Sequence, residues 1–133
     1  CFTWIIFKRK KKNKIICLDG DGSFFMHLGS FGMVSKSKNK KFIYILLDNE
    51  QHESVGNVRV DFNLDIKRFV KSVGFEKYVL IDNKNKSHLI PEYIDSTIVP
   101  IFIHIKTKVE ENFNLPRPKD LIKIKNNFLE KSY

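Results

Sequence analysis

Apolar residues in this chain gather into short runs, which are separated by polar stretches containing glycine, asparagine or proline. The four runs that we interpret as strands cover residues 14–19, 42–48, 77–81 and 98–105. They are almost continuously apolar, as is typical of parallel strands buried on both faces. Helical spacing predicts helices over residues 24–35, 65–73, 82–96 and 118–131. Strands that alternate with helices indicate an α/β fold.

The expected architecture is a three-layer α/β domain, with a mostly parallel sheet and helices on both faces. We assign residues 14–133 to this domain. Residues 1–13 form a basic N-terminal segment that matches the pattern of the domain poorly. Ser23 is the candidate N-cap of the first helix. The residues predicted to face inward from that helix are Phe24, Met26, Leu28 and Phe31.

The most informative motif is Gly20-Asp21-Gly22-Ser23, which follows the first predicted strand directly. Asn49 follows the second predicted strand, and the segment between the two strands has the length of one βαβ crossover. Parallel strands would therefore bring a carboxylate and a carboxamide to the same end of the sheet, where open α/β sheets bind ligands. Such oxygen donors beside glycines suit a magnesium ion that holds a diphosphate.

At these residues the chain resembles the C-terminal cofactor-binding module of thiamine-diphosphate-dependent enzymes. The stretches that carry the resemblance are CLDGDGSFFMHLGSFGMV at 17–34, LLDNEQHESVG at 46–56 and LPRP at 115–118. They resemble in particular the branch of phosphonopyruvate and sulfopyruvate decarboxylases. The resemblance runs in order over residues 14–131 and implies the thiamine-diphosphate-binding fold. The preceding CFTWIIFKRKKKN matches poorly, so we expect a fragment that is truncated at its N-terminus.

The resemblance implies a magnesium ion held by the side chains of Asp21 and Asn49 and by the backbone carbonyl of Gln51. Each side chain also has a structural interpretation. Asp21 could simply cap the following helix, and Asn49 could form a turn in the left-handed conformation, a frequent use of asparagine after a strand. The spacing between Asp21 and Asn49 favours the metal site.

Gly20, Gly22 and Ser23 would direct backbone amides at the diphosphate of thiamine diphosphate. His27 and His52 are candidates for contact with an anionic substrate group, with a half-buried helix histidine and a solvated loop histidine as the alternatives. Arg59 and Arg117 could also bind anions, but no spacing supports either. His88 and His104 are interpreted as structural.

The implied function is that of the diphosphate- and magnesium-binding module of a 2-keto acid decarboxylase, with 3-phosphonopyruvate as the leading substrate. Sulfopyruvate or another short anionic 2-keto acid is the alternative within this class, and an inactive remnant is another. The catalytic residues stay unknown, because the activating glutamate of the family belongs to a pyrimidine-binding domain. We therefore expect a partner domain or subunit, a homo- or hetero-oligomer, and no activity without that partner.

The net charge of +9 raises the alternative of a nucleic-acid-binding protein. Most of the excess lies in residues 8–14, without interleaved aromatic residues or a recognition helix, so we expect no nucleic-acid partner. Frequent lysine, isoleucine and asparagine also accompany AT-rich coding DNA. Two cysteines are too few for a disulfide framework, and residues 1–7 are too short to span a bilayer. We expect a cytoplasmic protein without membrane contact.

Overall fold

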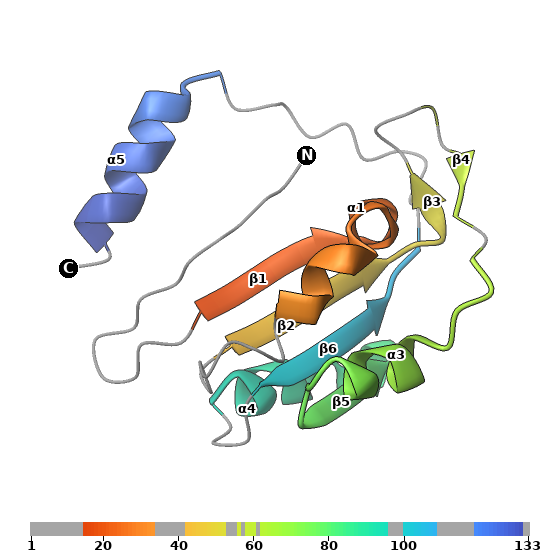
Figure 1. Cartoon of the computed structure of the whole chain (residues 1–133). Coiled ribbons are helices and arrows are strands. Elements are labelled where there is room, and N and C mark those ends of the chain that lie inside the picture. Colours follow the sequence, from red (N-terminus) through yellow and green to blue (C-terminus); the bar gives the residue numbers. More distant parts are fainter. Residues whose placement is uncertain are drawn as a thin grey trace.

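A computed structural model describes the chain at residues 15–33, 42–52, 56, 58–60, 62–95, 100–108 and 119–131 (Figure 1). The predicted basic segment lies outside these residues, and so does Arg117. The description therefore covers the strand and helix that contain the glycine motif, and every later strand of the predicted sheet.

Within the described residues the main sheet has four parallel strands, in the order β1-β2-β6-β5. Its strands are β1 (Ile15–Gly20), β2 (Phe42–Asp48), β6 (Ile101–Lys106) and β5 (Lys77–Ile81). The predicted bounds of β2 and β5 are confirmed, whereas β1 begins and ends one residue later than predicted. A short antiparallel pair, β3 (Gln51–His52) and β4 (Val58–Arg59), lies within the segment that follows β2.

Helices cover both faces of the sheet (Figure 1). The helical elements are α1 (Asp21–Met26), η1 (Leu28–Phe31), α3 (Ile66–Ser72), η3 (Lys84–Leu89), α4 (Ile90–Asp95) and α5 (Leu121–Lys131). Residues of α1, η1 and α3 pack on one face, and residues of α4 pack on the other. The predicted three-layer α/β architecture is therefore confirmed. Asp65 caps α3, because its carboxylate accepts a hydrogen bond from the backbone N–H of Arg68.

The first helix differs from its prediction in its start and in one inward residue. It begins at Asp21, with Gly20 in extended conformation as N-cap, so the prediction that Ser23 caps it is wrong. The extended backbone needed for an N-cap is supplied three residues earlier than expected, which places Ser23 inside the first helical turn. Met26 is 66% exposed and does not face inward, because the α-helix ends there and a separate 3₁₀ turn follows from Leu28.

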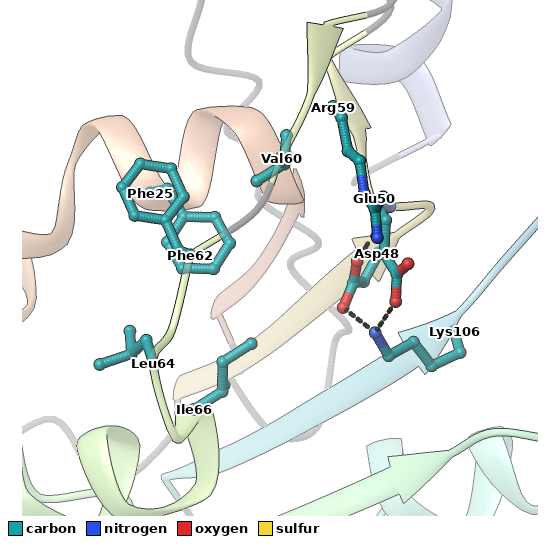
Figure 2. A pocket seen from close by; sticks show the side chains of 9 residues that line it. All are labelled: Phe25, Asp48, Glu50, Arg59, Val60, Phe62, Leu64, Ile66 and Lys106. Carbon is teal, nitrogen blue, oxygen red and sulfur yellow. Dashed lines mark hydrogen bonds and ion pairs between the residues drawn. The ribbon is translucent and has the colours of Figure 1, made fainter.

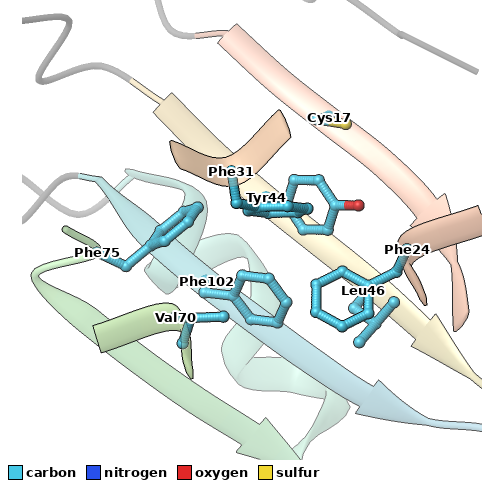
Figure 3. Close-up of a cluster of buried hydrophobic side chains, with 8 residues drawn as sticks. All are labelled: Cys17, Phe24, Phe31, Tyr44, Leu46, Val70, Phe75 and Phe102. Atoms are coloured by element: carbon cyan, nitrogen blue, oxygen red, sulfur yellow. The ribbon is translucent and has the colours of Figure 1, made fainter. Parts of the chain in front are cut away.

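Because side chains alternate along each strand, the sheet has one hydrophobic core on each face, and the two cores differ in composition. Tyr44, Leu46 and Phe102 face α1 and α3 in an aromatic cluster (Figure 3). Phe24 of α1 lies at its centre and is fully buried, with ring centroids 5.2 to 6.2 Å from five other aromatic rings. The opposite face presents isoleucines to α4, namely Ile43, Ile45, Ile81, Ile101 and Ile103. Cys17 is buried in the aromatic core.

The same alternation continues past the aromatic core to the polar end of the sheet. Asp48 follows Tyr44 and Leu46 on one face of β2, and His104 and Lys106 follow Phe102 on the same face of β6. In the register between these strands Leu46 is opposite His104, and Asp48 is opposite Lys106. Polar side chains of two strands therefore meet where the aromatic core ends.

Candidate metal and diphosphate site

The first turn of α1 contains two buried polar atoms without a hydrogen-bond partner among the described residues. They are Oδ2 of Asp21, whose side chain belongs to a residue only 3% exposed, and Oγ of Ser23. The other carboxylate oxygen of Asp21 accepts a hydrogen bond of 2.7 Å from the backbone N–H of Gly22. Because buried polar atoms in folded proteins are almost always paired, these two atoms make the turn a candidate binding site.

Electrostatics make the same turn unusual. Burial raises the pKa of Asp21, and the neighbouring carboxylate of Asp48 raises it further, while the backbone N–H groups of Gly22 and Glu50 act in the opposite direction. The carboxyl group of Asp21 therefore lies close to the end of β2. A cation at this position would favour the ionised form that burial disfavours.

Asp48, by contrast, is fully paired although it is only 5% exposed. Its Oδ2 atom accepts hydrogen bonds from His104 Nε2 at 2.6 Å and from Lys106 Nζ at 2.8 Å. Its Oδ1 atom accepts one from the backbone N–H of Glu50 at 3.1 Å. Burial alone would raise the pKa of Asp48, but the hydrogen bonds from His104 and Lys106 outweigh burial and lower it.

Tyr78 fixes the orientation of the His104 ring from the neighbouring strand β5. Its hydroxyl lies 2.8 Å from His104 Nδ1, and burial raises the pKa of Tyr78, so the hydroxyl keeps its proton at neutral pH. The carboxylate of Asp48 can only accept, so Nε2 of His104 donates to it, and the Tyr78 hydroxyl is the partner of Nδ1 on the other side of the ring. The sequence interpretation of His104 as structural is consistent with its burial, but it missed the contact with the end of β2.

The turn that follows Asp48 is held by local hydrogen bonds. Oδ1 of Asn49 accepts a hydrogen bond of 2.9 Å from the backbone N–H of Gln51. Glu50 has a φ of 60°, the left-handed conformation that non-glycine residues rarely adopt. The turn geometry foreseen for Asn49 is thus present, although the left-handed residue is its neighbour. The metal-binding role of Asn49 and of the Gln51 carbonyl stays a prediction.

The two candidate substrate histidines have different surroundings. The ring of His52 lies so close to Gly22 that a Cβ added to Gly22 would be 2.6 Å from ring atoms. Gly22 is therefore required by the approach of His52. His27 ends α1, and its Nδ1 donates to the carbonyl of Ser23 at 3.0 Å, within its own helix. The structure thus brings His52 to the glycine motif, whereas the described contact of His27 is intrahelical.

A pocket of about 250 Å³ opens beside the paired carboxylate Asp48 (Figure 2). One wall is apolar and includes the stacked rings of Phe25 and Phe62, whose centroids are 4.4 Å apart. The other wall is charged and contains Asp48 and Glu50 beside two cations, Lys106 and Arg59. Lys106 is bound to both carboxylates, while the described residues offer Arg59 no ion pair.

The donor chemistry fits magnesium and a diphosphate better than a metal held by protein alone. Across the described part of the chain, no group of three or more His, Cys, Asp and Glu side chains could hold an ion. The oxygen donors here are one carboxylate oxygen of Asp21 that has no partner among the described residues, and neutral oxygens at the end of β2, where Oδ1 of Asn49 accepts from the Gln51 N–H. Magnesium commonly uses one or two carboxylates together with substrate phosphates.

Comparison with known proteins gives the family. Residues 5–105 match the model of the thiamine pyrophosphate enzyme C-terminal TPP binding domain, and the chain belongs to this family. In structure it resembles transketolase from Campylobacter jejuni with a TM-score of 0.50 and 25% identity, over 71% of this chain and 15% of that chain.

Curated relatives in this family are sulfopyruvate decarboxylase β subunits. The protein of Methanocaldococcus jannaschii is 31% identical over 67 residues, which cover 49% of this chain and 36% of the relative. That of Methanothermobacter thermautotrophicus is 26% identical over 99 residues, covering 74% of this chain and 51% of the relative. That of Methanococcus maripaludis is 41% identical over 44 residues, covering 33% of this chain and 24% of the relative. The matched part thus spans about half or less of each relative's length.

Sequence reasoning missed the pairing of Asp48 with His104 and Lys106. A signal was available, because the last strand ends in His-Ile-Lys, and alternate polar residues on a buried strand mark a polar face. Its partner lay 56 residues away in the chain, however, and the strand order needed to join them could not be read from the sequence.

Among the described residues, no helix is long and apolar enough to cross a bilayer.

Proposed function

We propose that this chain is the diphosphate- and magnesium-binding half of a thiamine-diphosphate-dependent decarboxylase for a short anionic 2-keto acid. The observation that carries the proposal is the buried, unpartnered Oδ2 of Asp21 in the first turn after β1. Asp21 would hold the metal, together with Asn49 and the backbone carbonyl of Gln51. When bound, thiamine diphosphate supplies an electron sink for the pair released on loss of carbon dioxide.

Sulfopyruvate is the substrate that the comparisons favour. The expectation of 3-phosphonopyruvate gives way to this alternative because the three curated relatives are sulfopyruvate decarboxylase β subunits. Both substrates carry a second anionic group, which needs hydrogen-bond donors. Arg59 would meet that group, since its side chain lines the pocket beside Asp48 without an ion pair among the described residues.

The proposal includes a second subunit. The relatives are named as β subunits, which implies that they act beside a different chain. That partner would supply the pyrimidine-binding domain and the activating glutamate of this class of enzyme. Residues of the present chain would then bind the metal and diphosphate, orient the cofactor and meet the substrate's anionic end.

Calorimetry with thiamine diphosphate tests the binding half of the proposal directly. The chain is expected to bind the cofactor in the presence of Mg²⁺ and to lose this affinity when the metal is chelated. Asp21→Ala should abolish the metal-dependent part and keep the circular dichroism of the parent. Asp82→Ala is the matched control, because it removes an exposed carboxylate at the end of β5. Cofactor binding that is equal in the parent and in Asp21→Ala would disprove the metal assignment.

Decarboxylation tests the substrate. With a sulfopyruvate decarboxylase α subunit added, release of carbon dioxide from sulfopyruvate should exceed release from 3-phosphonopyruvate. Arg59→Gln should raise the KM for the anionic substrate more than it lowers kcat, because it removes a contact with a non-reacting group. The absence of any turnover, with cofactor binding intact, would favour the inactive remnant instead.

A further inference from the structure

The end of β6 is bonded to the turn between β2 and β3, which we define as residues 48–51 and call the β2–β3 turn (Figure 2). Lys106 Nζ lies 2.8 Å from Oδ2 of Asp48 and 2.9 Å from Oε1 of Glu50, so one ammonium group bridges two residues of this turn. His104 Nε2 reaches the same oxygen of Asp48 at 2.6 Å. The backbone N–H of Thr107 also donates to the Asp48 carbonyl at 2.7 Å.

These contacts act on a turn that would not keep its shape unaided. Glu50 has a φ of 60°, and a non-glycine residue in this region carries a conformational cost of about 1–2 kcal/mol. The cost is borne only where the surroundings specify the conformation. Three contacts do so at Glu50, namely the ion pair with Lys106, the hydrogen bond from Val60 N–H to the Glu50 carbonyl at 3.0 Å, and the hydrogen bond from the Glu50 N–H to Asp48 at 3.1 Å.

The same contacts decide which carboxylate is available to a cation. Asp21 and Asp48 lie close enough for their charges to interact. Both oxygens of Asp48 are engaged, by His104 and Lys106 on one side and by the Glu50 amide on the other. Oδ2 of Asp21 has no such partner among the described residues. The β6 side chains thus withdraw one carboxylate from metal binding and leave the other.

We propose that Lys106 and His104 are positioning residues, which hold the β2–β3 turn so that Asn49 and the Gln51 carbonyl face Asp21. The proposal rests on the proposed function for the identity of the ion, but its geometric part concerns only this chain. Neither residue touches the metal or the cofactor. Both act through Asp48 and Glu50, in the way that outer partners orient the ligands of a metal.

Lys106→Met is the informative variant, because Lys106 is 38% exposed at its side chain and methionine keeps much of its apolar length. Hydrogen exchange without any ligand should be faster at the amides of Glu50 and Gln51, which are bonded to the side chains of Asp48 and Asn49. In calorimetry, the Mg²⁺ dependence of thiamine diphosphate binding should shift by about 10–100-fold toward weaker binding.

Two further variants separate positioning from a general loss of charge. Lys106→Arg should restore most of the metal affinity and the slow exchange, because a guanidinium can also bridge two carboxylates. Lys86→Met removes a lysine of equal charge from an exposed ion pair with Asp82 and should change neither measurement. Metal affinity and turn exchange that are unchanged in Lys106→Met, or a tighter metal site, would overturn the proposal.

The two proposals fail in different ways. If the parent chain binds no cofactor with Mg²⁺, the proposed function fails, and the exchange rates alone decide whether Lys106 holds the turn. If the parent binds and Lys106→Met binds equally well, the function stands and the positioning role is wrong.

Discussion

The ends of β1 and β2 are neighbours in the sheet, and a buried aspartate lies at each, Asp21 directly after β1 and Asp48 as the last residue of β2, but the two aspartates have opposite surroundings. Asp48 has a histidine, a lysine and a backbone amide as partners. The carboxylate of Asp21 is influenced by the backbone amides of Gly22 and Glu50, and one of its oxygens has no hydrogen-bond partner among the described residues. The protein therefore supplies a counter-charge to Asp48, whereas no described cation is paired with Asp21.

Hydrogen-bond pairing distinguishes the two residues more clearly than burial does, since they are 3% and 5% exposed. When a buried carboxylate is paired with a cation, removing either partner destabilises the folded protein. A buried carboxylate without a cation destabilises the folded protein when it is ionised. Mutations at the two positions should therefore have effects of opposite sign on the stability of the ligand-free protein.

The largest effect is expected for Asp48→Ala. This change removes the acceptor shared by Lys106, the His104 N–H and the Glu50 amide, and each buried donor left without a partner costs about 1–3 kcal/mol. Urea denaturation should show this fall in the free energy of unfolding. Asp82→Ala, which breaks an exposed pair with Lys86, is the control and should leave stability unchanged. Equal stabilities of the two variants would remove the basis of the comparison.

An intermediate effect is expected at the glycines of the motif. Gly22→Ala places a methyl group 2.6 Å from the ring of His52 and should cost about 1–3 kcal/mol, as overpacking does. Gly20→Ala should be tolerated, because a Cβ there has no described atom within 4 Å and the residue has a φ of −93°. Thermal unfolding of the two variants measures the difference, and similar melting temperatures would mean that His52 does not need Gly22.

The smallest effect, and one of opposite sign, is expected for Asp21→Asn without metal. Burial and Asp48 raise the pKa of Asp21, so its ionisation costs stability, and that cost appears as the pH rises through its folded-state value. The variant cannot ionise there, so its melting temperature should be a few degrees higher than that of the parent at neutral pH. The difference should shrink at acidic pH, and a variant less stable than the parent at neutral pH would contradict this account.

The sequence predicted the features that depend on neighbours in the chain. The apolar runs predicted β2 and β5 residue for residue, and the glycine motif indicated the turn at Asp21. The sequence did not predict that Asp48 is withdrawn from the site, because its partners reach it only through the insertion of β6 beside β2. Nor did it predict the start of α1, since Gly20 serves as N-cap without a side-chain hydrogen bond.

The strand order has a consequence for how the protein folds. β6 lies between β2 and β5 although it is the last of the described strands to be synthesised, so β2 and β5 cannot acquire their shared neighbour until residues 101–106 exist. Contacts between residues so far apart in the chain form slowly. A nascent chain that stops before β6 would contain the whole glycine motif and both candidate metal-binding side chains, yet it would lack the strand that joins the two halves of the sheet.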